Sequence, residues 1–171
     1  MTAATGDARN TSSGPRGSPG FLLWRTTLRW QRGIAAALRP LELTHVQFVL
    51  LAAVWWLSDQ AVTSGQLPSQ RQVANHAEVD VMMTSQVVRS LEARGLLTRA
   101  PDPADARVKR LTVTNPGRRL AQQAVAVVEA ADADFFSSVH NPAQLLRVLR
   151  QLADDPAPAA VTTPPAHMKP S

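Results

Sequence analysis

The sequence predicts a mostly α-helical domain with one small β-hairpin. Apolar residues recur at helical spacing through most of residues 20–153. Near the middle of this stretch, two short helices are expected at 70–76 and 81–94. Two short strands, 96–100 and 108–113, follow them around a charged loop. Two helices followed by a hairpin is the order of a winged helix-turn-helix.

The first two helices are expected to supply much of the core. Residues 21–38 carry one apolar stripe, and Pro40 ends that helix because proline cannot continue it. Thr44 is suited to cap the next helix. Its run 46–57 is apolar nearly all round, which is typical of a buried helix, and residues 64–68 follow as a loop.

The two short helices have clear start signals. Ser69 and Asp80 are N-cap residues for helices 70–76 and 81–94, and Gly95 ends the second of them. Each helix is therefore expected to begin at a defined residue.

The C-terminal part of the domain is again helical. The hairpin loop, residues 101–107, is closed off by prolines. Thr114 caps a long helix that tolerates Pro116 in its first turn. Asn141 starts a last helix with leucines on one face.

Composition limits the function classes. Lys and Arg number 18 against 13 Asp and Glu, a formal net charge of +5 that fits a polyanionic partner without proving one. The chain has no cysteine, which excludes a disulfide framework, a thiol redox switch, a Cys-ligated zinc and a cysteine nucleophile. The four histidines are scattered along the chain, so no metal site is expected.

Both ends of the chain differ in composition from its middle. Residues 1–19 and 154–171 are poor in large apolar residues and rich in Pro, Gly, Ser, Thr and Ala, so disordered tails are expected there. The polar N-terminus predicts no signal peptide, and the apolar run 46–57 is too short to span a bilayer. We therefore expect a cytoplasmic protein with no membrane partner.

Helix 81–94 is expected to have two distinct sides, because successive residues turn by about 100° around a helix axis. The side expected to pack on the other helices consists of Val81, Thr84, Val88 and Leu91. The opposite side consists of Met82, Gln86, Arg89 and Ala93, with Met83 and Ser85 on its flanks.

The outward side suits the base edges of a DNA major groove. Gln can bond adenine bidentately, Arg can bond guanine, Ser can bond either, and Met can contact a thymine methyl group. The candidate base contacts are therefore Met82, Met83, Ser85, Gln86 and Arg89. The helices alone leave open a plain amphipathic pair with a polar surface.

The start of the preceding helix offers further candidates. Ser69, Gln70 and Arg71 lie there, where backbone amide groups are positioned to receive a phosphate.

The hairpin carries three cations close together. Arg107 lies near its tip, and Lys109 and Arg110 lie on the returning strand. A duplex backbone would neutralise these charges and release counterions. Arg107 is placed to enter a minor groove, and Asp105 to hold it extended. A solvated loop with a local ion pair is the alternative.

On these residues the chain resembles the MarR family of bacterial winged-helix regulators. The matching segments, in order, are LTHVQFVLL (43–51), TSQVVRSLEARGLLTR (84–99), DPADAR (102–107) and LTVTNPG (111–117). The resemblance covers about residues 21–152. One departure is Ala106, where many members carry a basic residue, so this hairpin is expected to contact phosphate less strongly.

The resemblance implies a homodimer in which helices from both subunits interlock, namely those within 21–38 and 115–153. Residues 69–113 would form the DNA-binding lobe, with helix 81–94 in the major groove and Arg107 in the minor groove. It also implies a palindromic operator on double-stranded DNA, because two-fold protein symmetry demands two half-sites.

The family resemblance further suggests a ligand pocket between the dimerisation helices and the DNA-binding lobe. All four tryptophans lie in the first two helices, and the chain has no tyrosine. Flat apolar rings with one N–H donor each suit a planar aromatic or phenolic effector. The candidate lining residues are Trp24, Trp30, His45, Phe48, Trp55 and Trp56. Packing in the core or the dimer interface is the alternative that we favour for these rings.

His45 is also a candidate for pH or ligand sensing, since histidine titrates near neutral pH. A satisfied or solvent-facing histidine near a helix start is the alternative. The missing cysteines argue against the peroxide-sensing members of the family.

Catalytic motifs are missing from the sequence. It has no Gly-rich phosphate loop, no GxSxG, no HExxH and no carboxylates paired on one helix face, so we expect neither an enzyme nor a cofactor. We expect a DNA-binding transcriptional regulator that acts as a repressor and that a small aromatic ligand releases from DNA. The alternative is a winged helix used for protein interaction without specific DNA binding. Gln86, Arg89 and Arg107 argue against that alternative.

Overall fold

The computed structural model describes residues 17–154. The predicted tails lie almost entirely outside this range. The chain divides after Phe135 into two compact units, and each is described by itself.

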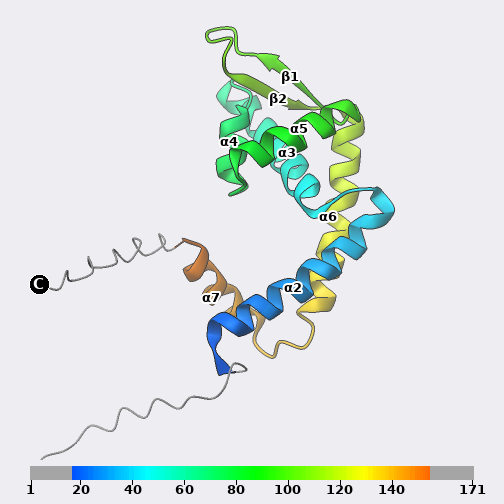
Figure 1. The fold of residues 1–171 in the computed structure, drawn as a ribbon, viewed down its shortest axis with the longest axis vertical. Coiled ribbons are helices and arrows are strands. Elements are labelled where there is room, and N and C mark those ends of the chain that lie inside the picture. The colour runs from blue at the N-terminus through cyan, green and yellow to red at the C-terminus, as the bar shows by residue number, and fades with distance from the viewer. Residues whose placement is uncertain (1–16, 155–171) are drawn as a thin grey trace, which may run out of the picture. The chain divides into compact units, whose positions relative to one another are not determined.

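The first unit contains the long helices α2, α3 and α6, the two short helices of a helix-turn-helix, and a β-hairpin (Figure 1). Its elements are α2 (Pro19–Leu38), the 3-10 turn η1 (Arg39–Leu41), α3 (His45–Ser64), α4 (Gln70–His76), α5 (Val81–Ala93), β1 (Leu97–Pro101), β2 (Lys109–Val113) and α6 (Asn115–Phe135). The predicted mostly helical winged helix-turn-helix is confirmed.

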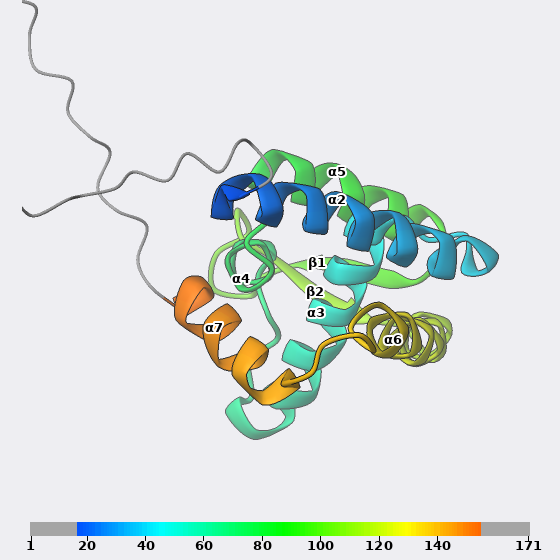
Figure 2. The same ribbon diagram turned by 90° about the horizontal axis from the view of Figure 1, so that it is seen from below.

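Helix α3 is the centre of this unit. It packs against α2, α4, α5, α6 and β2, and its residues Leu50, Leu51 and Val54 are fully buried. This explains why the run 46–57 is apolar nearly all round. Helix α2 packs along α6, which Figure 2 shows nearly end-on.

Two of the predicted N-caps form reciprocal capping boxes at the starts of α3 and α4. The Thr44 hydroxyl accepts a hydrogen bond from the Gln47 amide at 3.2 Å, and the Gln47 side chain accepts one from the Thr44 amide at 2.9 Å. Ser69 and Gln72 form the same reciprocal box at the start of α4, with distances of 3.2 and 2.8 Å. Such boxes satisfy amide groups that a helix start leaves unpaired.

The hairpin is a two-stranded antiparallel sheet, and we call residues 97–113 the wing. Its register pairs Leu97 with Val113 and Pro101 with Lys109. Each strand begins one residue later than predicted, because Leu96 still belongs to the bend after α5 and Val108 belongs to the turn at the wing tip. An isolated bridge between Ser69 and Arg110 joins the start of α4 to the wing.

A tight junction joins the wing to α6. The Thr114 hydroxyl donates to the Gly95 carbonyl at 2.7 Å and accepts from the Gly117 amide at 3.1 Å. A Cβ atom at Gly117 would lie 1.8 Å from the Leu96 carbonyl oxygen. The close approach of α6 to the wing therefore requires glycine at this position.

The second unit contains α7 (Pro142–Asp154). The Asn141 side chain accepts a hydrogen bond from the Gln144 amide at 3.0 Å, so the predicted start of this helix is confirmed. Its large exposed apolar side chains are Leu146, Val148, Leu149 and Leu152.

Within residues 17–154, no single helix is long and apolar enough to cross a membrane. One bent pair, Pro19–Leu41 with His45–Ala61 at 73°, meets the length and composition test only when the two helices are taken together.

Candidate nucleic-acid interface

Helix α5 has the two sides that the sequence predicts, with one correction. Thr84, Val88 and Leu91 are fully buried against the core. Val81 was expected on the same side but is 52% exposed. It lies in the first turn of α5, where it borders an open hollow instead of another helix.

The opposite side of α5 faces solvent. Met82 is 81% exposed and Met83 is 50% exposed, while Gln86 and Arg89 are also exposed. Ser85 is half-buried. Because the Asp80 carboxylate accepts hydrogen bonds from the Met82 and Met83 amides at 2.8 and 3.0 Å, the first turn is held in place.

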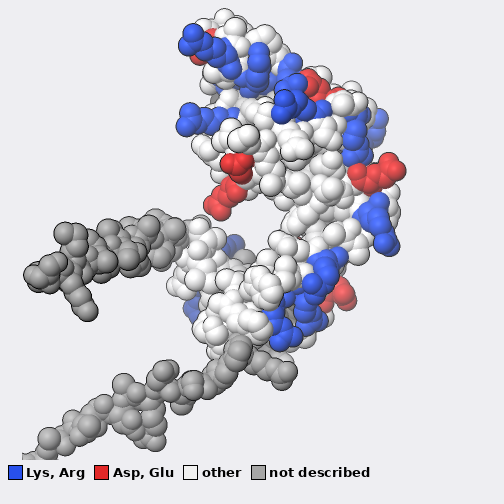
Figure 3. Space-filling view, viewed as in Figure 1, with Lys and Arg blue, Asp and Glu red and all other residues white. Residues whose placement is uncertain are grey.

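A hollow of about 490 Å³ lies between the start of α4, the start of α5 and the wing. It is lined by Ser69, Gln70, Arg71, Val81, Arg107, Val108 and Lys109. Five of these are predicted DNA contacts that lie up to 40 residues apart in the sequence. On the face shown in Figure 3, Lys and Arg side chains gather over the wing and the helices beneath it, and a second group lies over α2 and α6.

The start of α4 offers fewer free donors than its sequence indicates. The capping box already engages the amides of Ser69 and Gln72. Arg71 is exposed, whereas Ser69 and Gln70 are half-buried. The exposed cation at this helix start is Arg71.

The base of the wing is built on an ion pair that sequence reasoning missed. The Arg110 Nε donates to Asp102 Oδ2 at 2.5 Å, and its Nη1 donates to the Leu67 carbonyl at 2.8 Å. This guanidinium holds the pKa of the Asp102 carboxyl below its usual value. Arg110 is thus engaged in bonds within the protein, and the exposed members of the three clustered cations are Arg107 and Lys109.

The tip of the wing is shaped by carboxylates that bind backbone amides. Asp102 Oδ1 accepts from Ala104 N at 2.8 Å, and Asp105 Oδ1 accepts from Arg107 N at 3.0 Å. The contact of Asp105 with Arg107 is thus to the main chain, and in the described part of the chain no ion pair joins their side chains. Lys109 donates to the Ala106 carbonyl at 3.1 Å.

A second ion pair fixes α5 against the wing. Arg99 of β1 donates through its Nε to Glu92 of α5 at 2.6 Å, and both groups are partly buried. This ion pair links the last turn of α5 to the first strand of the wing.

The predicted aromatic residues do not line one site. Trp24 is 59% exposed, and the centroid of its ring lies 6.2 Å from that of the Phe21 ring. The Trp30 Nε1 donates to Asp132 at 2.6 Å. Trp56 is 51% exposed and stacks on His76 at 4.8 Å. Trp24, Trp30 and Trp56 therefore have separate partners, which sequence positions alone do not reveal.

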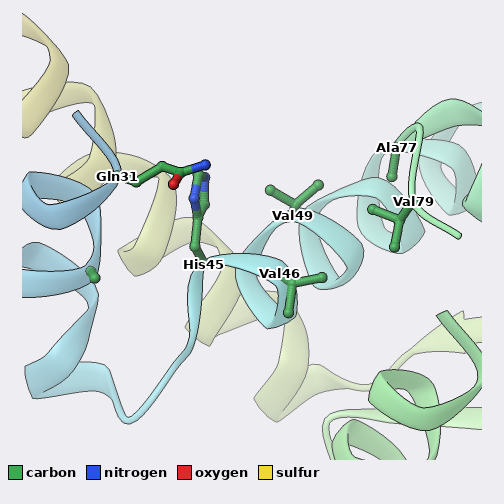
Figure 4. A pocket seen from close by; sticks show the side chains of 7 residues that line it. Gln31, His45, Val46, Val49, Ala77 and Val79 are labelled. Atoms are coloured by element: carbon green, nitrogen blue, oxygen red, sulfur yellow. The ribbon is translucent and has the colours of Figure 1, made fainter. Parts of the chain in front are cut away.

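Two smaller hollows adjoin α3. The first, of about 470 Å³, is lined by Gln31, Ala35, His45, Val46, Val49, Ala77 and Val79, and Figure 4 shows Gln31 and His45 at one end of it. The second, of about 380 Å³, is lined by Phe48, Val49, Ala52, Ala53, Trp56, His76 and Ala77. Three of the six predicted lining residues therefore border a hollow: His45 the first, and Phe48 and Trp56 the second.

His45 is the first residue of α3 and lies near Trp30 of α2 and Asp132 of α6. Its ring meets the Trp30 ring edge-on at 5.1 Å. Burial lowers the pKa of His45 from its usual 6.5, and the nearby Asp132 carboxylate opposes this by raising it. Burial outweighs the carboxylate, so the neutral form is favoured.

Comparison with known proteins decides the family. The MarR family model matches residues 43–109, which include α4, α5 and β1. The transcriptional regulator YdcH of Bacillus subtilis is 38% identical over 140 residues, which cover 82% of this chain and 92% of that protein. The chain belongs to the MarR family. It is a DNA-binding transcriptional regulator of the winged helix-turn-helix class.

Transcriptional repressors also resemble it over similar lengths. The transcriptional repressor Rv2887 of Mycobacterium tuberculosis is 34% identical over 80% of this chain and 94% of its own. Its structure in complex with DNA matches with a TM-score of 0.57 at 32% identity, covering 79% of this chain and 97% of that one. CouR of Rhodococcus jostii, bound to p-coumaroyl-CoA, matches with a TM-score of 0.68 at 30% identity, covering 83% and 96%.

Proposed function

We propose that this MarR-family protein is a repressor that binds a palindromic operator as a homodimer. In each subunit, the exposed side of α5 enters the major groove and the wing approaches the adjacent minor groove. The observation that carries this proposal is the hollow beside Val81, in which cations from α4 and the wing flank the exposed side of α5. The relatives named as repressors, including Rv2887, support the direction of control.

The proposed contacts divide into positioning and base recognition. Arg71 and Lys109 are exposed cations at the rim of this hollow and would bind phosphate. Gln86 and Arg89 lie on the exposed side of α5 and would bond base edges. Arg107, at the wing tip, would enter the minor groove, where the potential is most negative.

Exposed apolar side chains support the dimer. Leu22, Leu23 and Trp24 are adjacent and exposed at the start of α2. Helix α7 leaves four large apolar side chains exposed as well. Exposed clusters of large apolar side chains, such as each of these, are typical of interfaces between subunits.

The hollow between α2 and the turn before α5 supports a small-molecule effector. Gln31 and Ala35 border it from α2, whereas Ala77 and Val79 border it just ahead of Asp80, the N-cap of α5 (Figure 4). A ligand bound there would contact Ala77 and Val79 in the turn that precedes α5, so it could change the position of that helix. Rv2887 has been crystallised with p-aminosalicylic acid and CouR with p-coumaroyl-CoA, which favours an aromatic acid or its thioester.

The experiment that tests DNA recognition is a binding titration with the DNA upstream of the protein's own gene. A specific complex should survive excess competitor DNA of random sequence. Gln86→Ala should weaken specific binding by roughly 1–3 kcal/mol and relax the preference at one base pair per half-site. The matched control is Gln122→Ala, an exposed glutamine on α6, which should bind like the parent.

The alternative is a protein-interaction module without specific DNA binding, and the same titration tests it. Loss of the complex on adding competitor, with Gln86→Ala and Gln122→Ala indistinguishable from the parent, would favour that alternative.

A further inference from the structure

We propose that Met82 and Met83 select the C5-methyl groups of thymine, so that each operator half-site presents thymines to the first turn of α5. This inference rests on the proposed function and adds a chemical class of base contact to it.

The exposure of these two side chains is the starting observation. Met82 and Met83 are adjacent in the first turn of α5, at 81% and 50% exposure. A single exposed apolar residue needs no explanation, but two adjacent ones on the side of α5 that also carries Gln86 and Arg89 form an apolar patch beside base-bonding groups.

The charges around this patch indicate which part of a duplex would meet it. The Asp80 carboxylate caps the first turn by accepting from the Met82 and Met83 amides. A carboxylate at this position disfavours a phosphate there. The cations Arg71 and Lys109 instead border the hollow on the Val81 side. The DNA backbone is therefore expected along that hollow, and base edges at the two methionines.

Thymine is the base that offers an apolar group in the major groove. A methionine side chain is unbranched and polarisable, so it can adapt its position to a methyl group. The Asp80 hydrogen bonds fix the backbone from which both side chains extend. The expected contact is thus a flexible apolar side chain on a rigid helix start.

Gln86 extends the same pattern along the helix. It lies four residues after Met82 and three after Met83, so the three side chains are neighbours on the helix surface. A glutamine bonds adenine bidentately, and the partner of that adenine carries a C5-methyl group. Together these residues predict a half-site in which A·T pairs meet the first two turns of α5.

The test replaces thymine with deoxyuridine, which removes the methyl group and keeps every hydrogen-bonding group. A duplex is first selected by the full-length protein from a pool of random sequences. Each thymine of that duplex is then replaced singly by deoxyuridine. Affinity should fall about three- to fivefold at one or two positions in each half-site, the value expected for losing one buried methyl contact.

The variants assign the effect to the two methionines. In the Met82→Ala, Met83→Ala double variant, thymine and deoxyuridine should bind equally at those positions. Met82→Leu keeps an apolar side chain and should keep the discrimination. Leu67→Ala removes an exposed apolar residue from the loop before α4 and should also keep it. Circular dichroism checks that each variant is folded.

The outcomes are distinct. If a specific duplex is enriched, and deoxyuridine can replace each of its thymines without loss of affinity, this inference is overturned while the proposed function stands. Discrimination that persists in the double variant would overturn the role of the methionines. If no duplex is enriched, the proposed function fails and the inference fails with it. Should the double variant not fold, the deoxyuridine scan of the parent protein still tests the thymine contact, and the single variants Met82→Ala and Met83→Ala, each losing the discrimination at one position, test the methionines.

Discussion

Arg107 and Arg110 are three residues apart on the wing, yet the structure gives them different tasks. Arg110 is bonded to Asp102 and to the Leu67 carbonyl, so it holds the wing together. Arg107 is exposed at the tip, where the Asp105 carboxylate fixes its backbone amide. The same residue type therefore serves stability at one position and is available for DNA at the other.

This difference predicts opposite phenotypes. Arg107→Ala should weaken DNA binding with a modest loss of sequence preference and leave thermal stability unchanged. Arg110→Ala should lower thermal stability, because it removes a partner from Asp102 and leaves its carboxylate without a cation. Thermal melts and binding titrations of both variants check this. Equal effects of the two substitutions in both assays would contradict the division of tasks.

His45 predicts a pH dependence of stability. Its pKa is lowered in the folded protein, so the unfolded chain takes up a proton more readily. The stability associated with neutral His45 is thus fully present above the ordinary pKa of 6.5, and it is lost as the pH falls below that value.

Denaturant unfolding of the parent, between about pH 7.5 and 5.5, should therefore show a falling free energy of unfolding. His45→Gln should flatten this dependence, whereas His140→Gln, at an exposed position before α7, should not. Parallel curves for the parent and His45→Gln would rule out this role for His45.

At the scale of elements, the junction at Gly117 links the wing to α6. A Cβ atom there would clash with the Leu96 carbonyl oxygen at 1.8 Å, and backbone cannot move away as a side chain can. Gly117→Ala should therefore destabilise the fold by about 1–3 kcal/mol.

Gly33→Ala is the matched control for this substitution. Gly33 lies inside α2, and a Cβ atom there would meet nothing within 4 Å. Alanine should stabilise that helix by roughly 0.5–1 kcal/mol. Chemical denaturation measures both variants, and a Gly117→Ala protein as stable as the parent would show that α6 can shift away from the wing.

The elements that the sequence predicted correctly are those with local causes. Thr44, Ser69 and Asp80 cap helices through bonds to residues two or three positions ahead, which sequence spacing displays directly. The exposure of Val81 depends instead on the hollow between α4 and the wing. Helical periodicity treats every turn as equally covered, so it could not predict that the first turn of α5 lies open.

The same limit applies to the wing and to the aromatic residues. Asp102 and Arg110 are eight residues apart and meet only because the strands pair in register. The directions of Trp24, Trp30 and Trp56 depend on how α2 and α3 pack. The chemical character of the DNA-facing residues could be predicted from the sequence, whereas their neighbours required the tertiary structure.

At the scale of the whole molecule, the proposed dimer predicts that a charge in its interface separates the subunits. Leu23→Asp places a carboxylate in the exposed apolar start of α2, where an unpaired charge would be buried on association. Sedimentation should show the parent at twice the chain mass and the variant at the chain mass. Ala36→Asp, an exposed position on the side of the same helix away from Leu23, should remain a dimer. A parent protein that sediments as a monomer would contradict the dimer.

The salt dependence of DNA binding tests most directly whether the face formed by α4, α5 and the wing binds DNA. For the parent, the logarithm of affinity should fall steeply with the logarithm of salt concentration. Arg71→Ala with Lys109→Ala should reduce that slope by about 0.9 for each lost phosphate contact. Arg29→Ala with Arg32→Ala removes the same charge from the exposed side of α2 and should leave the slope unchanged. Equal slopes for the two double variants, or binding that does not depend on salt, would contradict this face as the DNA-binding surface.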